Sequence, residues 1–141
     1  MTDAPDTVAI LDQLGRLLRQ LARSTGAADG PSMTATQRIA LIEISEADPL
    51  RLNDLAARIG SSAPTASRAV DALDELGLVT RTTDADDRRA VRIELTEAGR
   101  RLVDERKVRA AAAFEPAVTA LPAADREQLL RLLARLTDAL S

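Results

Sequence analysis

The residues of this chain that are best suited to chemistry carry hydroxyl or guanidinium groups and gather in two short segments. One segment is 62–68, which is rich in serine and threonine, and the other is the charged run 84–89. Such side chains hydrogen-bond to phosphate oxygens and to the edges of bases. The chemistry that they offer is therefore recognition of a nucleic acid. The candidate contact residues are Ser62, Pro64, Thr65, Ser67, Arg68, Arg88 and Arg89.

Few residues are candidates for catalysis, because the chain contains no histidine and no cysteine. Without cysteine there is no disulfide scaffold and no thiolate metal site, and without histidine the commonest general base and metal ligand is missing. The adjacent acids Asp86 and Asp87 fall on a predicted hairpin tip, where they would be solvated and would brace arginine. We therefore expect no enzyme activity, no metal and no cofactor.

The net charge of −3 argues against a nucleic-acid partner, because domains that bind nucleic acids are often basic. Phosphates respond, however, to the charge placed opposite them and not to the sum over the chain. Lys107 is the only lysine, so nearly all the positive charge is arginine, which is suited to bidentate contacts with phosphate and guanine. The net charge therefore does not exclude binding to a nucleic acid.

A helix is predicted over 62–76, with Ser62 as its N-cap and Pro64 in its first turn, where a missing amide costs little. The outward residues at its start are small, hydroxylated or basic, whereas later ones such as Asp71 and Asp74 are acidic and would repel phosphate. This polarity and the helix dipole predict that the N-terminal end enters a DNA groove. The inward positions are Ala66, Ala69, Val70, Leu73 and Leu76.

A short helix over 53–58 precedes this one, with Asn53 as its N-cap and Gly60 as a left-handed C-cap. The strands 78–83 and 90–95 follow, joined by the turn 84–89. In that turn the acids come first and Arg88 and Arg89 follow, so an aspartate can brace one guanidinium while the other projects into a minor groove. A helix, a turn, a helix and a charged hairpin indicate a winged helix-turn-helix that docks on duplex DNA.

The segment before these elements predicts a helix from Thr34, with Gln37 at the spacing of a capping box. Its core face is Ala40, Leu41 and Ile44, and Asp48-Pro49 ends it before a short extended segment at 50–52. Ile39 and Ile42 lie on a flank. They are interpreted either as core filler or as the lining of an interface or a small-molecule cavity.

Helices with wide apolar stripes are predicted at both ends of the chain, over 7–23 and from Pro122 or Ala123 to Ala139. A long helix from Glu97 to about Phe114, limited by Pro116, leads into the last one, and residues 24–32 form a loop. The leucine density of the last helix exceeds what one small domain can bury, which favours burial in a homodimer. The alternative is packing of these helices within one chain.

The composition predicts a mainly helical fold with an aliphatic core, because only 1% of the 141 residues are aromatic. No apolar run approaches the about 20 residues needed to span a bilayer, and the acidic N-terminal residues differ from a signal peptide. We expect a cytoplasmic protein with no membrane partner.

In the order of these segments the chain resembles the MarR family of bacterial transcriptional regulators. The matching segments are 33–44, 52–56 and 62–79, and the most specific is the wing, Arg81-Thr82-Thr83-Asp84-Ala85-Asp86-Asp87-Arg88-Arg89, followed by Leu95-Thr96-Glu97-Ala98-Gly99. The resemblance implies a mainly α fold with a small β-hairpin wing. It divides the chain into a dimerisation helix and loop (1–30), a winged helix-turn-helix that binds DNA (31–95) and C-terminal dimerisation helices (96–141).

The resemblance also implies roles for individual residues. Arg88 is the wing-tip arginine that reaches into the minor groove, Asp84, Asp87 and Arg89 hold the wing in shape, and Ser67 and Arg68 lie on the recognition helix. It further implies a homodimer that binds a pseudo-palindromic operator in double-stranded DNA. We expect this dimer to act as a repressor by steric exclusion. A small-molecule effector pocket would involve Arg38, Ile39 and Ile42.

The chain departs from the family pattern at two positions, Ala85, which replaces the usual wing proline, and Arg38, where an aromatic residue is common. Ala85 predicts a more mobile wing, and the scarcity of aromatic residues argues against an aromatic effector. The competing hypothesis is a winged helix that no longer binds DNA and contacts a protein partner through its leucine-rich face. The acidic net charge favours this alternative, and the wing arginines oppose it.

Overall fold

The structure, a computed structural model, describes residues 4–25 and 30–140. Residues 26–29 of the predicted loop and the first three residues of the acidic N-terminus lie outside the described residues. The chain divides into two compact units, one formed by the residues from Ala28 to Lys107 and the other by those before and after that segment.

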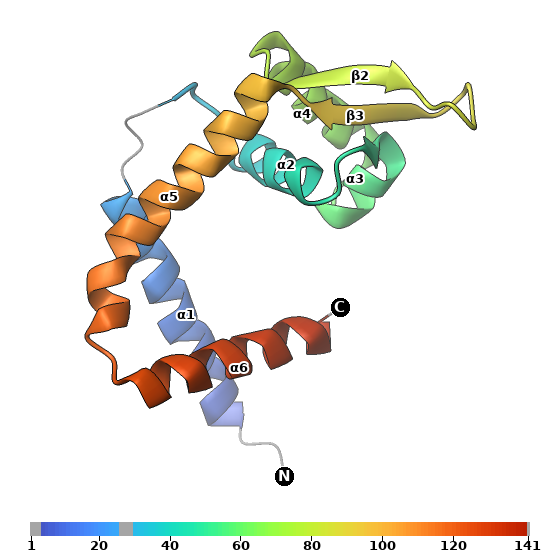
Figure 1. Cartoon of the computed structure of the whole chain (residues 1–141). Helices are drawn as coiled ribbons and strands as arrows, with labels where there is room; N and C mark the ends of the chain where they lie inside the picture. Colours follow the sequence, from blue (N-terminus) through green and yellow to red (C-terminus); the bar gives the residue numbers. More distant parts are fainter. Residues whose placement is uncertain (1–3, 26–29, 141) are drawn as a thin grey trace. The chain divides into compact units, whose positions relative to one another are not determined.

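The unit between Ala28 and Lys107 consists of three helices and a small antiparallel sheet (Figure 1). The strand order is β1-β3-β2, and β2 and β3 form a ribbon that extends beyond the helices. This arrangement confirms the predicted winged helix-turn-helix with a hairpin wing. In chain order the elements are α2 (Ala35–Glu46), β1 (Leu50–Arg51), α3 (Leu52–Arg58), α4 (Ala63–Glu75), β2 (Val79–Thr83) and β3 (Val91–Leu95), followed by the first turns of α5 (Glu97–Thr119).

The core of this unit is aliphatic, as the composition predicts. Its fully buried large side chains come from every helix and from the sheet, and burying each of them stabilises the fold by about 1.5–3 kcal/mol before the entropy cost. Alanines on α4 keep its inner face narrow, so this helix packs closely against α2 and α3. The largest fully buried side chains are Leu41, Ile44, Leu55, Leu73, Ile93, Val70 and Val79.

Local capping explains where the helices begin and end, and three of the predicted caps are confirmed. The Thr34 hydroxyl accepts from the Gln37 amide at 3.2 Å while the Gln37 side chain accepts from the Thr34 amide at 2.9 Å, which completes a capping box. Ser62 is the N-cap of α4. Gly60 follows α3 with a φ of 61°, a left-handed conformation that glycine adopts without strain.

The junction between β3 and α5 is held against the end of α4 through Thr96. The Thr96 hydroxyl donates to the Gly77 carbonyl at 2.6 Å and accepts from the Gly99 amide at 3.0 Å. Gly99 lies against the Leu78 backbone carbonyl so closely that a Cβ atom there would collide with it. A residue without a side chain is therefore required at this point of α5.

The predicted N-cap of α3 is wrong, because the helix begins at Leu52 and its N-cap is Arg51, without a side-chain hydrogen bond. Leu50 and Arg51 pair with Ile93 and Arg92 of β3. This pairing holds the backbone extended as far as Arg51, so the helix starts immediately afterwards and Asn53 falls inside it.

Two further predictions at helix ends are wrong. Leu76 was expected to point inward, but it is 41% exposed, because it is the C-cap of α4, after which Gly77 turns the chain. Pro116 was expected to limit the long helix, but α5 continues through it to Thr119. Pro116 and Ala112 are both exposed, so water can bond to the carbonyl that the missing proline amide leaves open.

The other unit contains α1 (Ala4–Ser24), the end of α5 and α6 (Ala123–Leu140). Helix α6 has no buried residue, and the leucines of α1 that form its apolar stripe are mostly exposed. The predicted apolar stripes are therefore uncovered in the single chain. Among the helices of residues 4–25 and 30–140, none combines the length and apolarity needed to cross a membrane.

Candidate nucleic-acid interface

The first turn of α4 presents hydroxyl groups at the surface. Ser62, Pro64 and Thr65 are exposed, and Ser67, one turn later, is half-buried. The Ser62 hydroxyl accepts from the Thr65 amide at 3.3 Å and lies 2.9 Å from the Thr65 hydroxyl. This pair holds two hydroxyls at the positive end of the helix dipole, where an anion is favoured.

Arg68 is exposed beside these residues and borders an open cleft of about 200 Å³. The cleft lies where the beginning of α4 meets the beginning of α2. The other lining residues are Thr34, Thr36, Gln37, Thr65 and Ala69. The predicted contact residues of α4 thus lie together on one end of the helix.

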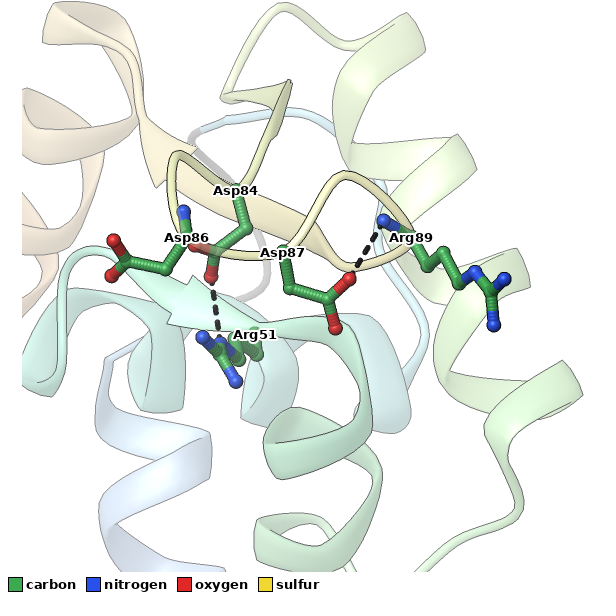
Figure 2. A network of polar contacts seen from close by, with 5 residues as sticks. All are labelled: Arg51, Asp84, Asp86, Asp87 and Arg89. Carbon is green, nitrogen blue, oxygen red and sulfur yellow. Dashed lines mark hydrogen bonds and ion pairs between the residues drawn. The ribbon is translucent and has the colours of Figure 1, made fainter.

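The wing loop is shaped by two aspartates (Figure 2). Oδ1 of Asp84 accepts from the Asp86 amide at 2.9 Å, and Oδ1 of Asp87 accepts from the Arg89 amide at 3.0 Å. Both are turns closed by an aspartate side chain on the backbone two residues later. These bonds fix the path of the loop between β2 and β3.

The ion pair of the wing joins the loop to strand β1 and not to an arginine of the loop itself. Nε of Arg51 in β1 donates to Oδ2 of Asp84 at 2.7 Å. The expectation was that an aspartate would brace Arg88 or Arg89. Among the described residues, the ion pairs involve neither guanidinium, and both arginines are exposed at the tip.

The environment of Asp84 favours its charged form. Its side chain is only 1% exposed, while that of Arg51 is 47% exposed. The hydrogen bond from the Asp86 amide and the pairing with Arg51 hold the pKa of Asp84 below its usual value, against the opposing effect of burial. The same pairing raises the pKa of Arg51. The pair is therefore charged at neutral pH.

Arg51 and Arg81 were missed in the sequence, although both make structural contacts at this surface. Arg81 in β2 reaches α4, where its Nη2 lies 2.7 Å from Oδ1 of Asp71. The alternation of side chains along a strand could have indicated that Arg81 faces inward, because Arg81 lies on the same face of β2 as Val79, which is buried. No local signal identifies Arg51, since its partner is 33 residues away.

The three residues assigned to an effector pocket lie on α2. Nη1 of Arg38 donates to the Met33 carbonyl at 2.6 Å. Ile39 is 48% exposed and Ile42 46%, so they are not core filler of the winged-helix unit. None of the three lines the cleft beside Arg68, and their role in binding an effector stays a prediction.

The chain is similar to a known protein family and to several solved structures. The model of the MarR family matches residues 32–90. A probable transcriptional regulator from Pseudomonas aeruginosa, whose structure is solved, is 33% identical over 90% of this chain and 98% of its own, with a TM-score of 0.61.

Two more distant solved structures show the same fold. A MarR family protein from Bacillus stearothermophilus is 24% identical over 99% of each chain, with a TM-score of 0.81. The PcaV transcriptional regulator from Streptomyces coelicolor, solved with its natural ligand, is 23% identical over 99% of this chain and 95% of its own, with a TM-score of 0.64. The likeness covers the helices at both ends as well as the winged helix.

Proposed function

Because the chain belongs to the MarR family of transcriptional regulators, we propose that it acts as a homodimeric repressor that binds a pseudo-palindromic operator in duplex DNA. In this proposal α4 enters the major groove with its N-terminal end, and the wing lies over the adjacent minor groove. Bound in this way, the protein excludes the transcription machinery from the promoter. It acts in the cytoplasm and has no enzyme activity.

The proposal rests on the side chains exposed at two places of one compact unit, the start of α4 and the tip of the wing. Ser62, Thr65 and Arg68 stand at the start of α4, and Arg88 and Arg89 stand at the tip of the wing. Hydroxyls and a guanidinium on a helix end match base edges and phosphates, and an arginine on a narrow ribbon matches the negative potential of a minor groove.

Dimerisation is proposed from the uncovered apolar stripes of α1 and α6. Leucines such as Leu11 and Leu130, 62% and 70% exposed, are costly to leave in water, and a second copy of the chain offers the same stripe in return. A two-fold dimer would present its two recognition helices about 10 bp apart on one face of the duplex.

Release by a small molecule is the further part of the proposal. The Streptomyces coelicolor regulator was solved with its natural ligand. By analogy, Arg38, Ile39 and Ile42 would line an effector pocket in this protein. With an aromatic content of 1%, the chain offers few stacking surfaces, so an aliphatic effector is favoured.

The test is a mobility shift and footprint with the DNA upstream of the gene that encodes this chain. The expected result is a protected palindromic site that competes well against an unrelated duplex of equal length. Equal binding to both duplexes would contradict sequence-specific regulation. No binding to either would favour the alternative, a protein-interaction module, which the net charge of −3 supports.

A further inference from the structure

Arg81 joins the stem of the wing to the recognition helix. Its guanidinium Nη2 lies 2.7 Å from Oδ1 of Asp71, and it donates to the Ser67 carbonyl at 3.1 Å and to the Ser67 hydroxyl at 3.4 Å. Ser67 and Asp71 are one helical turn apart, so one guanidinium spans a full turn of α4. Both elements belong to the same compact unit.

The position of Arg81 in the sheet explains why it reaches α4. Arg81 pairs in register with Ile93, which is fully buried, so the two side chains share the face of the sheet that covers the core. A long basic side chain at this position extends along the sheet toward the helix. Its side chain is 32% exposed and that of Asp71 57% exposed, so the contact lies at the edge of the core.

We propose that Arg81 is a positioning residue that fixes α4 relative to the wing and thereby sets operator specificity. The inference rests on the proposed function, in which α4 and the wing engage two grooves at once. Holding two contact elements in their bound arrangement before binding removes an ordering cost that the complex would otherwise carry. A wrong base is then penalised, because α4 does not shift to accommodate it.

The same contact has an electrostatic effect on the DNA-facing side of α4. Asp71 follows Ser67 and Arg68 by one turn, and an unpaired carboxylate there would repel phosphate. Arg81 neutralises that charge. Because the guanidinium donates to the Ser67 oxygen, the Ser67 hydroxyl proton points elsewhere and is available to a base acceptor, such as those of guanine in the major groove.

The experiment compares Arg81→Ala, Arg81→Lys, Asp71→Asn and the double variant Arg81→Ala/Asp71→Asn. Dissociation constants for the operator and for an unrelated duplex are measured by fluorescence anisotropy at several salt concentrations. Arg81→Ala is expected to weaken operator binding about tenfold, and to weaken it more than binding to the unrelated duplex. Adding Asp71→Asn should restore part of this loss, and Arg81→Lys should retain less than full specificity, because the lysine side chain is shorter and its ammonium would not reach the position of Nη2 between Ser67 and Asp71.

Asp71→Asn alone gives the sharpest outcome, because the proposal predicts opposite changes in two quantities. Binding to the unrelated duplex should strengthen, since a negative charge is removed, while the preference for the operator should fall, since the link is broken. Equal strengthening on both duplexes would overturn the proposal and leave Asp71 a repulsive charge only. A salt slope lower by about one in Arg81→Ala, with no rescue by Asp71→Asn, would overturn it in favour of a direct phosphate contact.

Failure of this proposal is distinguishable from failure of the proposed function. If the unchanged protein binds no operator, regulation by DNA binding fails, whereas the link is still measurable in the free protein. A double-variant cycle in denaturant should then show a coupling of about two- to fivefold in the folding equilibrium between Arg81 and Asp71. If the two substitutions showed no coupling, Arg81 and Asp71 would not interact in solution and the proposal would be overturned.

Discussion

Nε of Arg51 donates to Oδ2 of Asp84 across 2.7 Å, although the two residues are 33 positions apart in the chain. Arg51 ends the short strand β1, and Asp84 begins the loop at the end of β2. The contact thus ties the base of the wing loop to the outer strand on the other side of β3. The wing is held by this contact and by the turn that Asp84 closes on the Asp86 amide (Figure 2).

The first prediction concerns the acid stability of the wing loop. Because the folded-state pKa of Asp84 is lowered, its stabilising effect is present above the usual value of 3.8 and is lost as the pH falls through the lowered value. We expect the chemical shift of the Asp86 amide to titrate with a midpoint below 3.8. NMR spectra between neutral and acidic pH check this, and Asp84→Asn should abolish the transition. A midpoint at or above the usual value would contradict the arrangement.

The second prediction separates the two causes of that shift. Replacing Arg51 by methionine removes the guanidinium but leaves the hydrogen bond from the Asp86 amide, which is the largest single cause of the lowered pKa. The Asp84 midpoint should therefore rise, yet stay below its usual value. The same NMR titration on the variant measures it. An unmoved midpoint would show that Arg51 does not stabilise the carboxylate in solution.

The third prediction concerns the close approach of α5 to the end of α4. Gly99→Ala places a methyl group against the Leu78 carbonyl, a backbone atom that cannot move aside without shifting the chain. We expect the free energy of unfolding to fall by about 1–3 kcal/mol, measured in denaturant. Gly15→Ala in α1 is the matched control, because its new methyl group meets only the flexible end of Arg19. A loss of stability as large in the control would remove the structural explanation.

Elements that depend on neighbouring residues were predictable from the sequence, and contacts between distant segments were not. Thr34, Ser62 and Gly60 act within one turn of their helices, so their residue types were sufficient to place the caps. Asn53 has an equally good residue type but is overruled by the pairing of β1 with β3, which no local pattern reveals.

The same distinction between local features and distant contacts applies to the candidate site. The polarity of α4 and the arginines of the wing were predictable, because each is a pattern of neighbouring residues in the sequence. The partners of Asp84 and Asp71 depend on how the sheet brings Arg51 and Arg81 beside them. Pro116 shows a third case, in which solvent exposure lets a helix continue through a residue that usually ends it.

The fourth prediction concerns the wing tip. Arg88→Ala removes an exposed positive charge that we assign to the minor groove, so binding should weaken on every duplex and the salt slope should fall by about one. Arg101→Ala removes the same charge from α5 and serves as the control. Titrations at several salt concentrations measure both. Unchanged affinity and slope in Arg88→Ala would remove this residue from the proposed contact.

The fifth prediction concerns the apolar face of α6, where Leu129, Leu132, Leu133, Leu136 and Leu140 recur at helical spacing and are all exposed. In the proposed homodimer this face is buried, and Leu136→Glu would place a charge in it twice, once from each copy. Burying an unpaired carboxylate is far more costly than losing a leucine contact. We therefore expect the dissociation constant of the dimer to rise by at least about a hundredfold.

Analytical ultracentrifugation over a range of concentrations checks this expectation. Ala124→Glu is the matched control, because it adds the same charge to the same helix at an exposed position on the side away from the leucines. Operator binding should decline with the dimer in Leu136→Glu and should be retained in Ala124→Glu, since one recognition helix alone reads only half of a palindrome. If both variants dimerise as the unchanged protein does, the leucine face of α6 is not the interface between the two copies.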